Sequence, residues 1–540
     1  MALNDEEPLV TFDVLLRSCG DLNRFQYIHY FFLNIVAIST GVAAFFYVYG
    51  AGEPHHRCKL LMWPNDQYYS VNSSHQYLIN KWIPKNTDGT FMKCSIYKSN
   101  STNTSIPTNE LMDCREWVYD RSIFGYTFTE EANMVCKSKS RKSLLAAVLQ
   151  FAGIFTVVCG SLGDKIGRKV SASITTGFLY IILIITQTVI QFVPMSIDTK
   201  FWLLIINQFA CGLVSAIYSI TFVLMLELTS AAHTTFAANT ALVSFTIGEA
   251  LVTLFAYLCR NWQLLKWVNT IFIGLMLPYL YFMPESPQFL YSKKNYLKLE
   301  ILLRKITRMN KKLEAEWYPY YQELLRYNRI SRPVNTKSFV QQTKEIVTHK
   351  PTMSKLLIVS LIGFTTLLLY IKISYGLAAM GDFSPYIGTL IGAIVEGAGY
   401  VAGGLLVLKM GRKLSFIAFT TLTGTCILII PFIIHRYQVP TILISQLGKF
   451  AISGCIAVSW IFVPELFPTA IRSSANGFFI AMSRAGAMLA PIIDSLVDDN
   501  YVNVTFYVYT GFAVIIILLS LFLPETKDVS LADAPDDISI

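Results

Sequence analysis

The stretch Gly160-Ser-Leu-Gly-Asp-Lys-Ile-Gly-Arg-Lys169 follows an apolar run, and it returns in altered form as Gly404-Leu-Leu-Val-Leu-Lys-Met-Gly-Arg-Lys413, 244 residues further on. Two more pairs recur in the same order at offsets of 238 and 240 residues: Glu227-Leu with Glu465-Leu, and Pro284-Glu-Ser-Pro with Pro524-Glu-Thr-Lys. Three ordered pairs at nearly one spacing indicate that the chain consists of two related halves.

The composition indicates that both halves lie in a membrane. Of the 540 residues, 53% are hydrophobic and 15% are charged, whereas soluble proteins carry about 25% charged residues. Apolar stretches long enough to cross a bilayer recur along the chain. We expect twelve membrane spans, at 26–48, 144–161, 173–193, 201–222, 234–258, 263–283, 355–378, 383–408, 414–434, 440–463, 473–492 and 504–523.

The predicted fold is therefore an all-α integral membrane protein with twelve transmembrane helices in two pseudo-repeated six-helix halves. The predicted parts are an N-terminal segment (1–25), the first span (26–48), a large loop (49–143), the rest of the first half (144–283), a basic linker (284–354), the second half (355–523) and an acidic tail (524–540).

Charge predicts the orientation of the chain. Residues 291–355 carry fifteen Lys and Arg against five acidic residues, whereas the whole protein has a net charge of +9. Basic loops stay on the cytoplasmic side, so we expect this segment and both termini to be cytoplasmic, in a multi-pass protein of the plasma membrane. A basic loop beside anionic lipid explains the charge without nucleic-acid binding.

The loop 49–143 is expected on the outside. It contains four cysteines, Cys58, Cys94, Cys114 and Cys136, and three glycosylation acceptors, Asn72, Asn100 and Asn103. Both features are typical of an oxidising, extracellular compartment. Four cysteines allow three pairings, and the sequence does not choose among them.

The repeated motifs suggest a transporter whose two halves rock about a central site. Asp164, Arg168 and Lys169 could form ion pairs that break when the halves move. The alternative is that Gly-Arg-Lys is only a basic turn that sets the topology. An ATP-driven pump and a membrane enzyme are both disfavoured, because the chain has no phosphate-binding Gly-x-x-x-x-Gly-Lys-[Ser/Thr] loop and no His-Glu-x-x-His motif. No cofactor and no bound metal is expected.

The segment 160–169 resembles the signature loop of the major facilitator superfamily. The outer loop and the motifs Pro284-Glu-Ser-Pro287, Leu447-Gly-Lys-Phe450 and Pro464-Glu-Leu-Phe-Pro468 resemble those of the organic cation/anion/carnitine transporter family, over nearly the whole chain. The resemblance implies alternating access, with gating or coupling residues Asp164, Arg168, Lys169, Glu227, Glu285, Arg412, Glu465 and Arg472.

Two positions depart from the family pattern. Leu408 stands where an aspartate is usual in the second signature loop. Thr234 stands where a basic residue is usual, whereas Arg472 occupies the matching place in the second half. We therefore expect the charged network of the first half to be the weaker one.

Arg484 is the first candidate for a solute contact. It lies in a span, in Ala481-Met-Ser-Arg-Ala-Gly-Ala-Met-Leu-Ala-Pro491, where an unpaired Arg costs roughly 2.5–3.5 kcal/mol. The small residues on its face indicate that it points inward. A guanidinium there suits a carboxylate, and an ion pair with Glu396 or Glu465 is the alternative. Family members that favour cations tend to carry an acidic residue at this place, so Arg484 argues against a simple cation transporter.

Three further candidates among the ionisable residues in the spans are Glu249, Glu396 and Lys372. Either glutamate could face an amine, and Glu249 could instead carry a proton. Lys372 could pair with one of them; unpaired, it would make the pocket doubly positive and favour anions. At the position of Tyr400, carnitine-type members of the family carry a tyrosine and anion-preferring members tend to carry a lysine. The resemblance therefore implies a carnitine-type solute.

Aromatic residues complete the predicted site, because ring faces attract ammonium groups. The candidates are Tyr218, Phe222 and Tyr375, with ordinary packing as the alternative. The sequence thus predicts a transporter of a small organic zwitterion, such as carnitine, a betaine or an amino acid, with Na⁺ or H⁺ as a possible co-transported ion. An organic-anion exchanger, an organic cation transporter and a non-transporting solute sensor are the alternatives, and the oligomeric state stays open.

Overall fold

The computed structural model describes residues 11–60, 62–86, 89–99, 107–330, 350–378, 384–434, 437–467, 472–497 and 502–527. The first half contains α2 (Arg24–Gly50), α5 (Lys139–Ile154), α6 (Thr156–Ile166), α7 (Arg168–Phe192), α8 (Ile197–Gly212), α9 (Val214–Glu227), α10 (Thr234–Cys259), α11 (Trp262–Gly274) and α12 (Leu277–Phe282). The second half contains α17 (Lys350–Ala378), α18 (Pro385–Met410), α19 (Arg412–Ile433), α20 (Gln438–Glu465), α21 (Arg472–Leu496) and α22 (Val502–Ser520).

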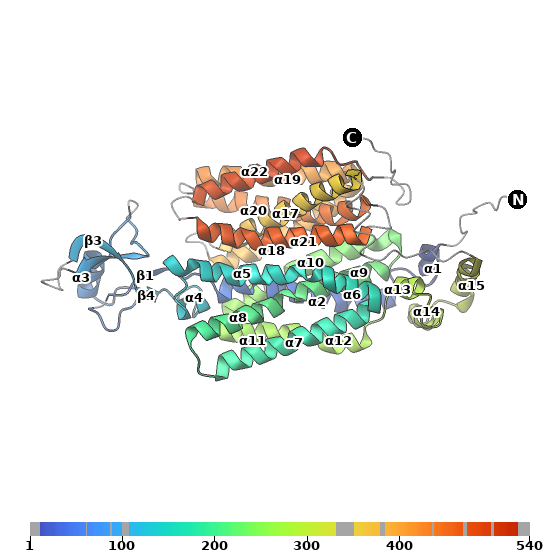
Figure 1. Cartoon of the computed structure of the whole chain (residues 1–540), viewed down its shortest axis with the longest axis horizontal. Helices are drawn as coiled ribbons and strands as arrows, with labels where there is room; N and C mark the ends of the chain where they lie inside the picture. Colours follow the sequence, from blue (N-terminus) through green and yellow to red (C-terminus); the bar gives the residue numbers. More distant parts are fainter. Residues whose placement is uncertain are drawn as a thin grey trace.

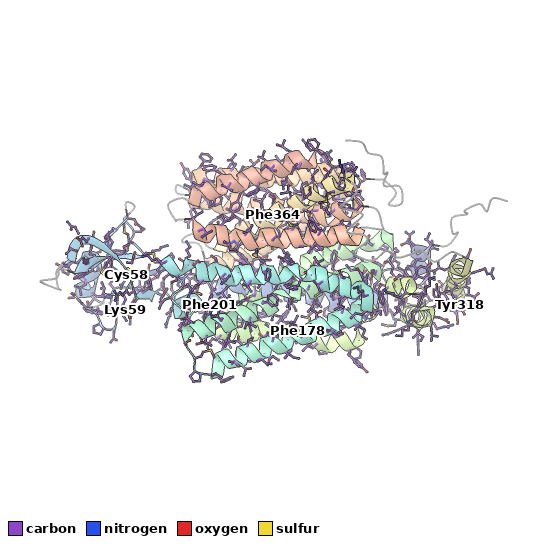
Figure 2. All side chains as sticks on the ribbon, in the orientation of Figure 1. Cys58, Lys59, Phe178, Phe201, Tyr318 and Phe364 are labelled. Atoms are coloured by element: carbon purple, nitrogen blue, oxygen red, sulfur yellow. A yellow bond between two sulfur atoms is a disulfide. The ribbon has the colours of Figure 1, made fainter. Side chains whose placement is uncertain are left out.

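Twelve helical segments in the described residues are long and apolar enough to cross a membrane, as predicted. Three spans of the first half are each built from two helices: α5 with α6, α8 with α9, and α11 with α12. Aromatic side chains such as Phe178 of α7, which is 59% exposed, cover the outside of the bundle (Figure 2). Exposed rings of this kind suit a surface that faces lipid rather than water.

The two halves form the two layers of the bundle (Figure 1). They meet where α5 packs on α21 and where α10 packs on α18. Within the first half, α2 and α10 approach closely through Gly41 and Gly248, where a Cβ atom would run into the backbone of the opposite helix. Small residues allow such contacts between membrane helices.

The end of the bundle opposite the segment 51–138 carries the helices of the linker. They are α13 (Pro287–Ser292), α14 (Tyr296–Asn310) and α15 (Glu314–Ile330), and they lie near α1 (Phe12–Ser18) (Figure 1). Asn310 ties this unit to the chain start, because its amide donates to the carbonyl oxygen of Gly20 at 2.8 Å and its oxygen accepts the N–H of Phe25 at 2.9 Å.

The long segment between α2 and α5 folds into a small unit, here called the cap (residues 51–138). Its elements are β1 (His56–Cys58), α3 (Ser73–Trp82), β2 (Ser95–Ser99), β3 (Pro107–Asp113), β4 (Trp117–Tyr119), α4 (Phe128–Glu131) and the 3₁₀ helix η1 (Cys136–Ser138), and a second short 3₁₀ helix, η2 (Ala231–His233), precedes α10. Strand β1 pairs with β4, and β2 pairs with β3, both antiparallel.

Two disulfides cross-link the cap, Cys58–Cys114 and Cys94–Cys136. This settles which of the three pairings the fold uses. Asn72 is exposed at the start of α3, so its glycosylation stays a prediction, whereas Asn100 and Asn103 lie outside the described residues.

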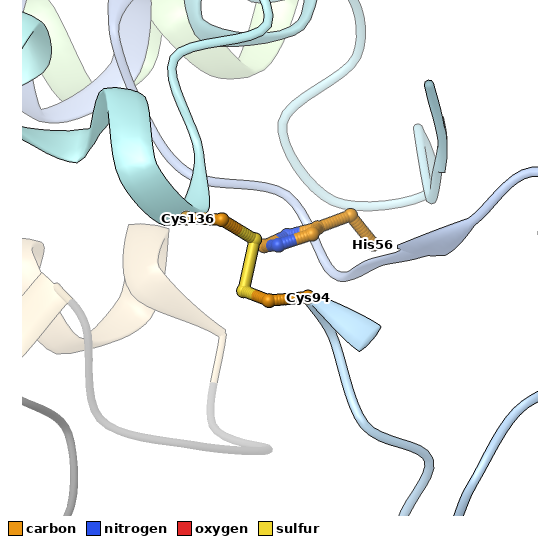
Figure 3. Close-up of side chains that lie close together, drawn as sticks. All are labelled: His56, Cys94 and Cys136. Carbon is orange, nitrogen blue, oxygen red and sulfur yellow. A yellow bond between two sulfur atoms is a disulfide. The ribbon is translucent and has the colours of Figure 1, made fainter. Parts of the chain in front are cut away.

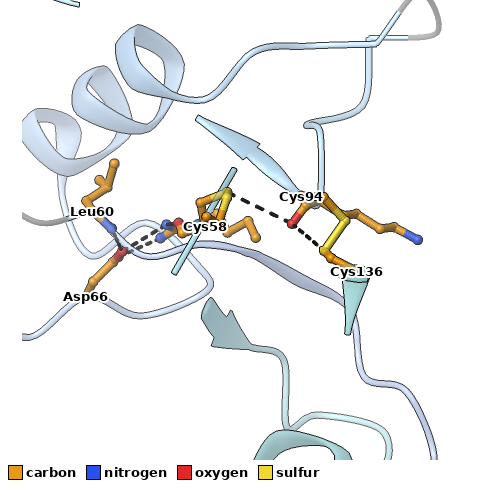
Figure 4. The surroundings of a disulfide bond; sticks show 8 residues. Cys58, Leu60, Asp66, Cys94 and Cys136 are labelled. Carbon is orange, nitrogen blue, oxygen red and sulfur yellow. Dashed lines mark hydrogen bonds and ion pairs between the residues drawn. A yellow bond between two sulfur atoms is a disulfide. The ribbon is translucent and has the colours of Figure 1, made fainter. Parts of the chain in front are cut away.

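A buried ion pair organises the cap beside the first disulfide (Figure 4). Asp66 accepts two hydrogen bonds from Arg57, at 2.6 and 2.9 Å, one from the N–H of Leu60 at 2.7 Å and one from His75 at 2.8 Å. Burial alone would raise the pKa of Asp66, but these donors lower it below its ordinary value. The stability that the carboxylate supplies is therefore full at neutral pH and is lost only as the pH falls through this lowered pKa.

We expect Asp66→Asn to destabilise the cap by about 3–5 kcal/mol, because it leaves the buried charge of Arg57 without its anion. Trypsin cleavage within the cap of the purified full-length protein, measured without reductant, checks this. The matched control is Glu116→Gln, which removes an exposed pair with Lys59 worth about 0–1 kcal/mol. Equal cleavage rates for the two variants would contradict the assignment.

Candidate functional site: charged groups at the interfaces between the halves

Arg484 lies at the interface of α21 with α5. Its side chain passes over Gly153, where a Cβ atom would come within 2.8 Å of its Cδ atom. Its guanidinium donates to the amide oxygen of Gln150 at 3.3 Å. Within the described residues no carboxylate pairs with Arg484, and the two pairs considered from the sequence, with Glu396 or Glu465, are not formed there.

Glu249, Lys449 and Glu396 form a buried triad at the other interface. The ammonium of Lys449 is 2.5 Å from Glu249 and 3.2 Å from Glu396, and the exposed fractions of all three side chains are 0–1%. Glu396 also accepts hydrogen bonds from Tyr370 at 3.0 Å and from Tyr400 at 2.7 Å. The ammonium of Lys449 therefore takes the place beside the two carboxylates that the sequence reading gave to a solute amine.

Lys372 has a different partner from the one expected. Its ammonium is 2.7 Å from Asp494 of α21 and 3.3 Å from the hydroxyl of Thr505, and it lies over the rings of Phe506 and Tyr509. The pairing with Glu249 or Glu396, which the sequence left open, is not formed, because Lys449 occupies the space beside both. Because Asp494 balances the charge of Lys372, Lys372 does not make the pocket doubly positive.

Aromatic side chains surround the centre. Tyr218 and Phe222 of α9 are 5.9 Å apart, and Phe222 meets Trp460 of α20 across the halves at 5.4 Å. The hydroxyl of Tyr218 is buried, without a hydrogen-bond partner among the described residues. Tyr375 donates to the carbonyl oxygen of Ala44 in α2 at 3.1 Å, which joins the halves on the cap side.

The first signature loop forms a charged network at the end of the bundle away from the cap. Arg168 makes hydrogen bonds of 2.9 and 3.0 Å to Glu227 and an ion pair of 2.9 Å with Asp164. Glu285 accepts the backbone N–H groups of Arg168 at 2.7 Å and of Lys169 at 3.3 Å. A carboxylate at this place stabilises the start of α7.

The second half repeats this geometry. Arg412 bonds to Glu465 at 3.0 and 3.1 Å, and Glu525 accepts the backbone N–H groups of Arg412 at 2.8 Å and of Lys413 at 3.0 Å. Leu408 is exposed and gives Arg412 no second carboxylate. The duplication inferred from sequence motifs is thus also a duplication of contacts.

Contrary to the expectation from the sequence, the charged network of the first half is not the weaker of the two by its number of ion pairs. Within the described residues, Arg168 has two carboxylate partners and Arg412 has one. Thr234, on which the expectation rested, starts α10. The side chain of Arg472, its predicted counterpart, lies outside the described residues.

Sequence reasoning overlooked three members of the site. Lys449 was noted only as part of a motif, although an ionisable residue inside the span 440–463 meets the same criterion that selected Lys372. Asp494 lies two residues beyond the predicted end of its span. The contact of Gln150 with Arg484 could not be predicted, because the sequence around a single amide in an apolar helix does not indicate which residue it will contact.

One cluster has the residue types of a metal site but not its chemistry. His56, Cys94 and Cys136 lie together in the cap, and Figure 3 shows the ring of His56 beside the bond between the two sulfur atoms. Cysteines joined in a disulfide have no thiolate to offer a metal, and burial lowers the pKa of His56. The cluster is therefore a packed disulfide.

Comparisons with known proteins agree with this architecture. The family model described as "Sugar (and other) transporter" matches residues 76–537. The inward-open xylose transporter XylE of E. coli has the same fold, with a TM-score of 0.62 at 14% identity, over 94% of this chain and 99% of that one. At that identity the likeness concerns the fold alone.

Curated relatives are similar over almost their whole length. Solute carrier family 22 member 4 of Mus musculus is 26% identical, covering 97% of this chain and 93% of the relative. Solute carrier family 22 member 12 of the same species is 26% identical, over 98% and 96%. Organic cation/carnitine transporter 2 of Mus musculus is 25% identical, over 98% and 94%. The chain belongs to the sugar and other transporter family of the major facilitator superfamily, as a membrane transporter and not an enzyme, and it has the predicted likeness to the organic cation/carnitine transporters.

Proposed function

We propose that the protein carries a small organic zwitterion, a carnitine-like betaine or an amino acid, across the plasma membrane by alternating access. The cap would lie outside, and the linker and both termini in the cytoplasm. The observation that carries the proposal is Arg484, a guanidinium inside the bundle that packs over Gly153, donates to the amide oxygen of Gln150 and has no carboxylate partner among the described residues. A solute carboxylate would supply the missing anion.

The cationic end of the solute would rest on aromatic rings rather than on a carboxylate. Glu249 and Glu396 are engaged by Lys449, whereas Tyr218, Phe222 and Trp460 form an aromatic group that spans both halves. Rings attract ammonium groups by about 0.5–2 kcal/mol. One relative is named an organic cation/carnitine transporter, and carnitine combines a quaternary ammonium with a carboxylate.

Neutralisation of Lys372 by Asp494 weighs against the organic-anion exchanger, because a single free guanidinium matches one carboxylate. A dicarboxylate would bring a second negative charge, whereas Lys372, the second cation considered for the site, is already paired. The contacts at Arg168 and Arg412 would hold the cytoplasmic ends of the helices in one state until the halves move.

We expect Arg484→Gln to lower kcat/KM for zwitterion uptake by roughly 10- to 150-fold, because a hydrogen bond to a charged group is worth about 1.5–3 kcal/mol. The measurement is uptake of labelled carnitine, β-alanine, a quaternary amine without carboxylate and a dicarboxylate, at equal surface expression. Arg141→Gln, which removes an exposed pair with Asp198, is the matched control and should transport normally.

The same panel separates the alternatives. Competition by the dicarboxylate but not by carnitine identifies an anion exchanger. Entry of only the quaternary amine, undiminished in Arg484→Gln, makes the arginine structural. Binding of a solute without counterflow in reconstituted vesicles identifies a sensor.

We also expect Gly153→Ala to raise KM for the zwitterion, because the new methyl group would displace the side chain of Arg484. Displacement of a binding group by about 1 Å can cost 100-fold. Gly160→Ala in the same span is the matched control, because a Cβ atom there meets nothing within 4 Å. The role of Arg484 in solute binding would be contradicted if both variants had the same KM as the wild type.

A further inference from the structure

The triad of Glu249, Lys449 and Glu396 belongs to both halves at once. Glu249 stands on α10 of the first half, whereas Glu396 and Lys449 stand on α18 and α20 of the second half. The bond between Lys449 and Glu249 therefore crosses the interface where α10 packs on α18. Any motion that parts these helices at mid-membrane must break it.

The triad contains one carboxylate more than it has cations. When all three groups are ionised its net charge is −1, inside a region where the side chains are essentially unexposed. The Oε2 atom of Glu249 has no hydrogen-bond donor among the described residues. A buried, ionised oxygen without a hydrogen-bond donor costs free energy. One added proton would make the triad neutral and would occupy the oxygen that has no donor.

We propose that the Oε2 atom of Glu249 is the site that takes up one proton per transport cycle, so that solute and proton cross together. The inference rests on the proposed transport function. The proton comes from water, binds Oε2 and turns the carboxylate into a neutral acid, and the hydrogen bond from Lys449 to Oε1 breaks. When the triad forms again, the proton leaves to water on the opposite side.

The second carboxylate is what makes this step possible. After protonation, Glu249 is neutral in the first half, and Lys449 remains paired with Glu396 within the second half at 3.2 Å. Separation of the halves then leaves no isolated charge. Without the proton, the same separation strands Glu249 as a buried anion, a cost of several kcal/mol in real proteins. Parting of α10 from α18 therefore depends on the proton.

A metal ion fits this place less well than a proton. The ammonium of Lys449 already lies between the two carboxylates, where a cation would bind. Two of the lone pairs on Glu396 are also taken by Tyr370 and Tyr400. The Oε2 atoms of Glu249 and Glu396 both lack a hydrogen-bond donor among the described residues. That of Glu396 has the ammonium of Lys449 at 3.2 Å, whereas the ammonium contacts Glu249 at Oε1, so Oε2 of Glu249 is the oxygen left for a proton.

The other titratable groups near the triad are tyrosines. They are Tyr49 of α2, Tyr218 of α9, Tyr370 and Tyr375 of α17, and Tyr400 of α18. On α11, Lys266 is turned toward the ring of Phe46 and the sulfur of Cys211 instead. Tyrosines are neutral at physiological pH, so Glu249 and Glu396 are the groups of this set whose charge a proton can change there.

A cavity on the cap side comes close to the triad. A cavity of about 2170 Å³ beneath the cap is lined by Tyr375 of α17 and by Thr441 and Ser445 of α20. Ser445 lies one helical turn before Lys449 on the same helix. Water in this cavity is therefore separated from the triad by about one turn of α20.

The test uses the purified full-length protein in vesicles that contain a trapped pH-sensitive dye, with labelled carnitine and β-alanine as probes. We expect an inward proton gradient of one pH unit to drive up to about tenfold accumulation, and solute addition to acidify the interior. In Glu249→Gln, whatever uptake remains should be the same with and without the gradient. The exposed control, Glu116→Gln, should behave as the wild type.

Counterflow of the same solutes, which needs no gradient, separates the two proposals. If the wild type shows counterflow but no response to the gradient, proton coupling is wrong and the transport function stands. If Glu249→Gln keeps the wild-type response, the proton binds elsewhere and the assignment to the triad is wrong. If no probe shows counterflow, both proposals fall. Should Glu249→Gln not reach the membrane, Glu249→Asp, which still titrates, must keep a gradient response.

Discussion

The structure depends on one constraint: a charge inside a bilayer has no water to solvate it, so it needs a partner from another helix. Lys372 reaches Asp494, and Lys449 reaches two glutamates. Each pair joins spans that are distant in the sequence and fixes how they pack. Separation of such a pair leaves two buried charges without partners. A conformational change that separates the two members therefore costs free energy.

The repeated loops use the same constraint at the membrane surface. Glu285 and Glu525 each accept two backbone N–H groups at the start of a helix that follows a glycine with positive φ, Gly167 or Gly411. A side chain at either glycine would be strained and would meet the glutamate. The Gly-Arg-Lys motif is therefore more than a topology signal, because the turn, the helix start and the ion pair need all three residues together.

The sequence predicted the framework well because hydropathy is a local property. All twelve spans, the two halves and the four disulfide cysteines follow from runs and spacings within the chain. The partners of the buried charges do not, because Lys372 and Asp494 are 122 residues apart and Lys449 and Glu249 are 200 residues apart. Reading each ionisable residue alone left Glu249 to face a solute amine or to carry a proton, and only the packing of the two halves brings Lys449 to it.

The two interfaces between the halves have diverged in a way that suits a transporter. Span 5 and span 11 occupy equivalent places in the duplication, yet the first carries Glu249 and the second Arg484. Glu249 is bonded across its interface, whereas Arg484 has an amide and a glycine opposite it. One interface is thus closed by an ion pair within the protein, whereas the guanidinium at the other has no carboxylate partner among the described residues. Identical charges at both places would give either two ion pairs between the halves or none. If a solute carboxylate binds Arg484 as we propose, the protein holds one interface by its own ion pair and the solute supplies the anion at the other.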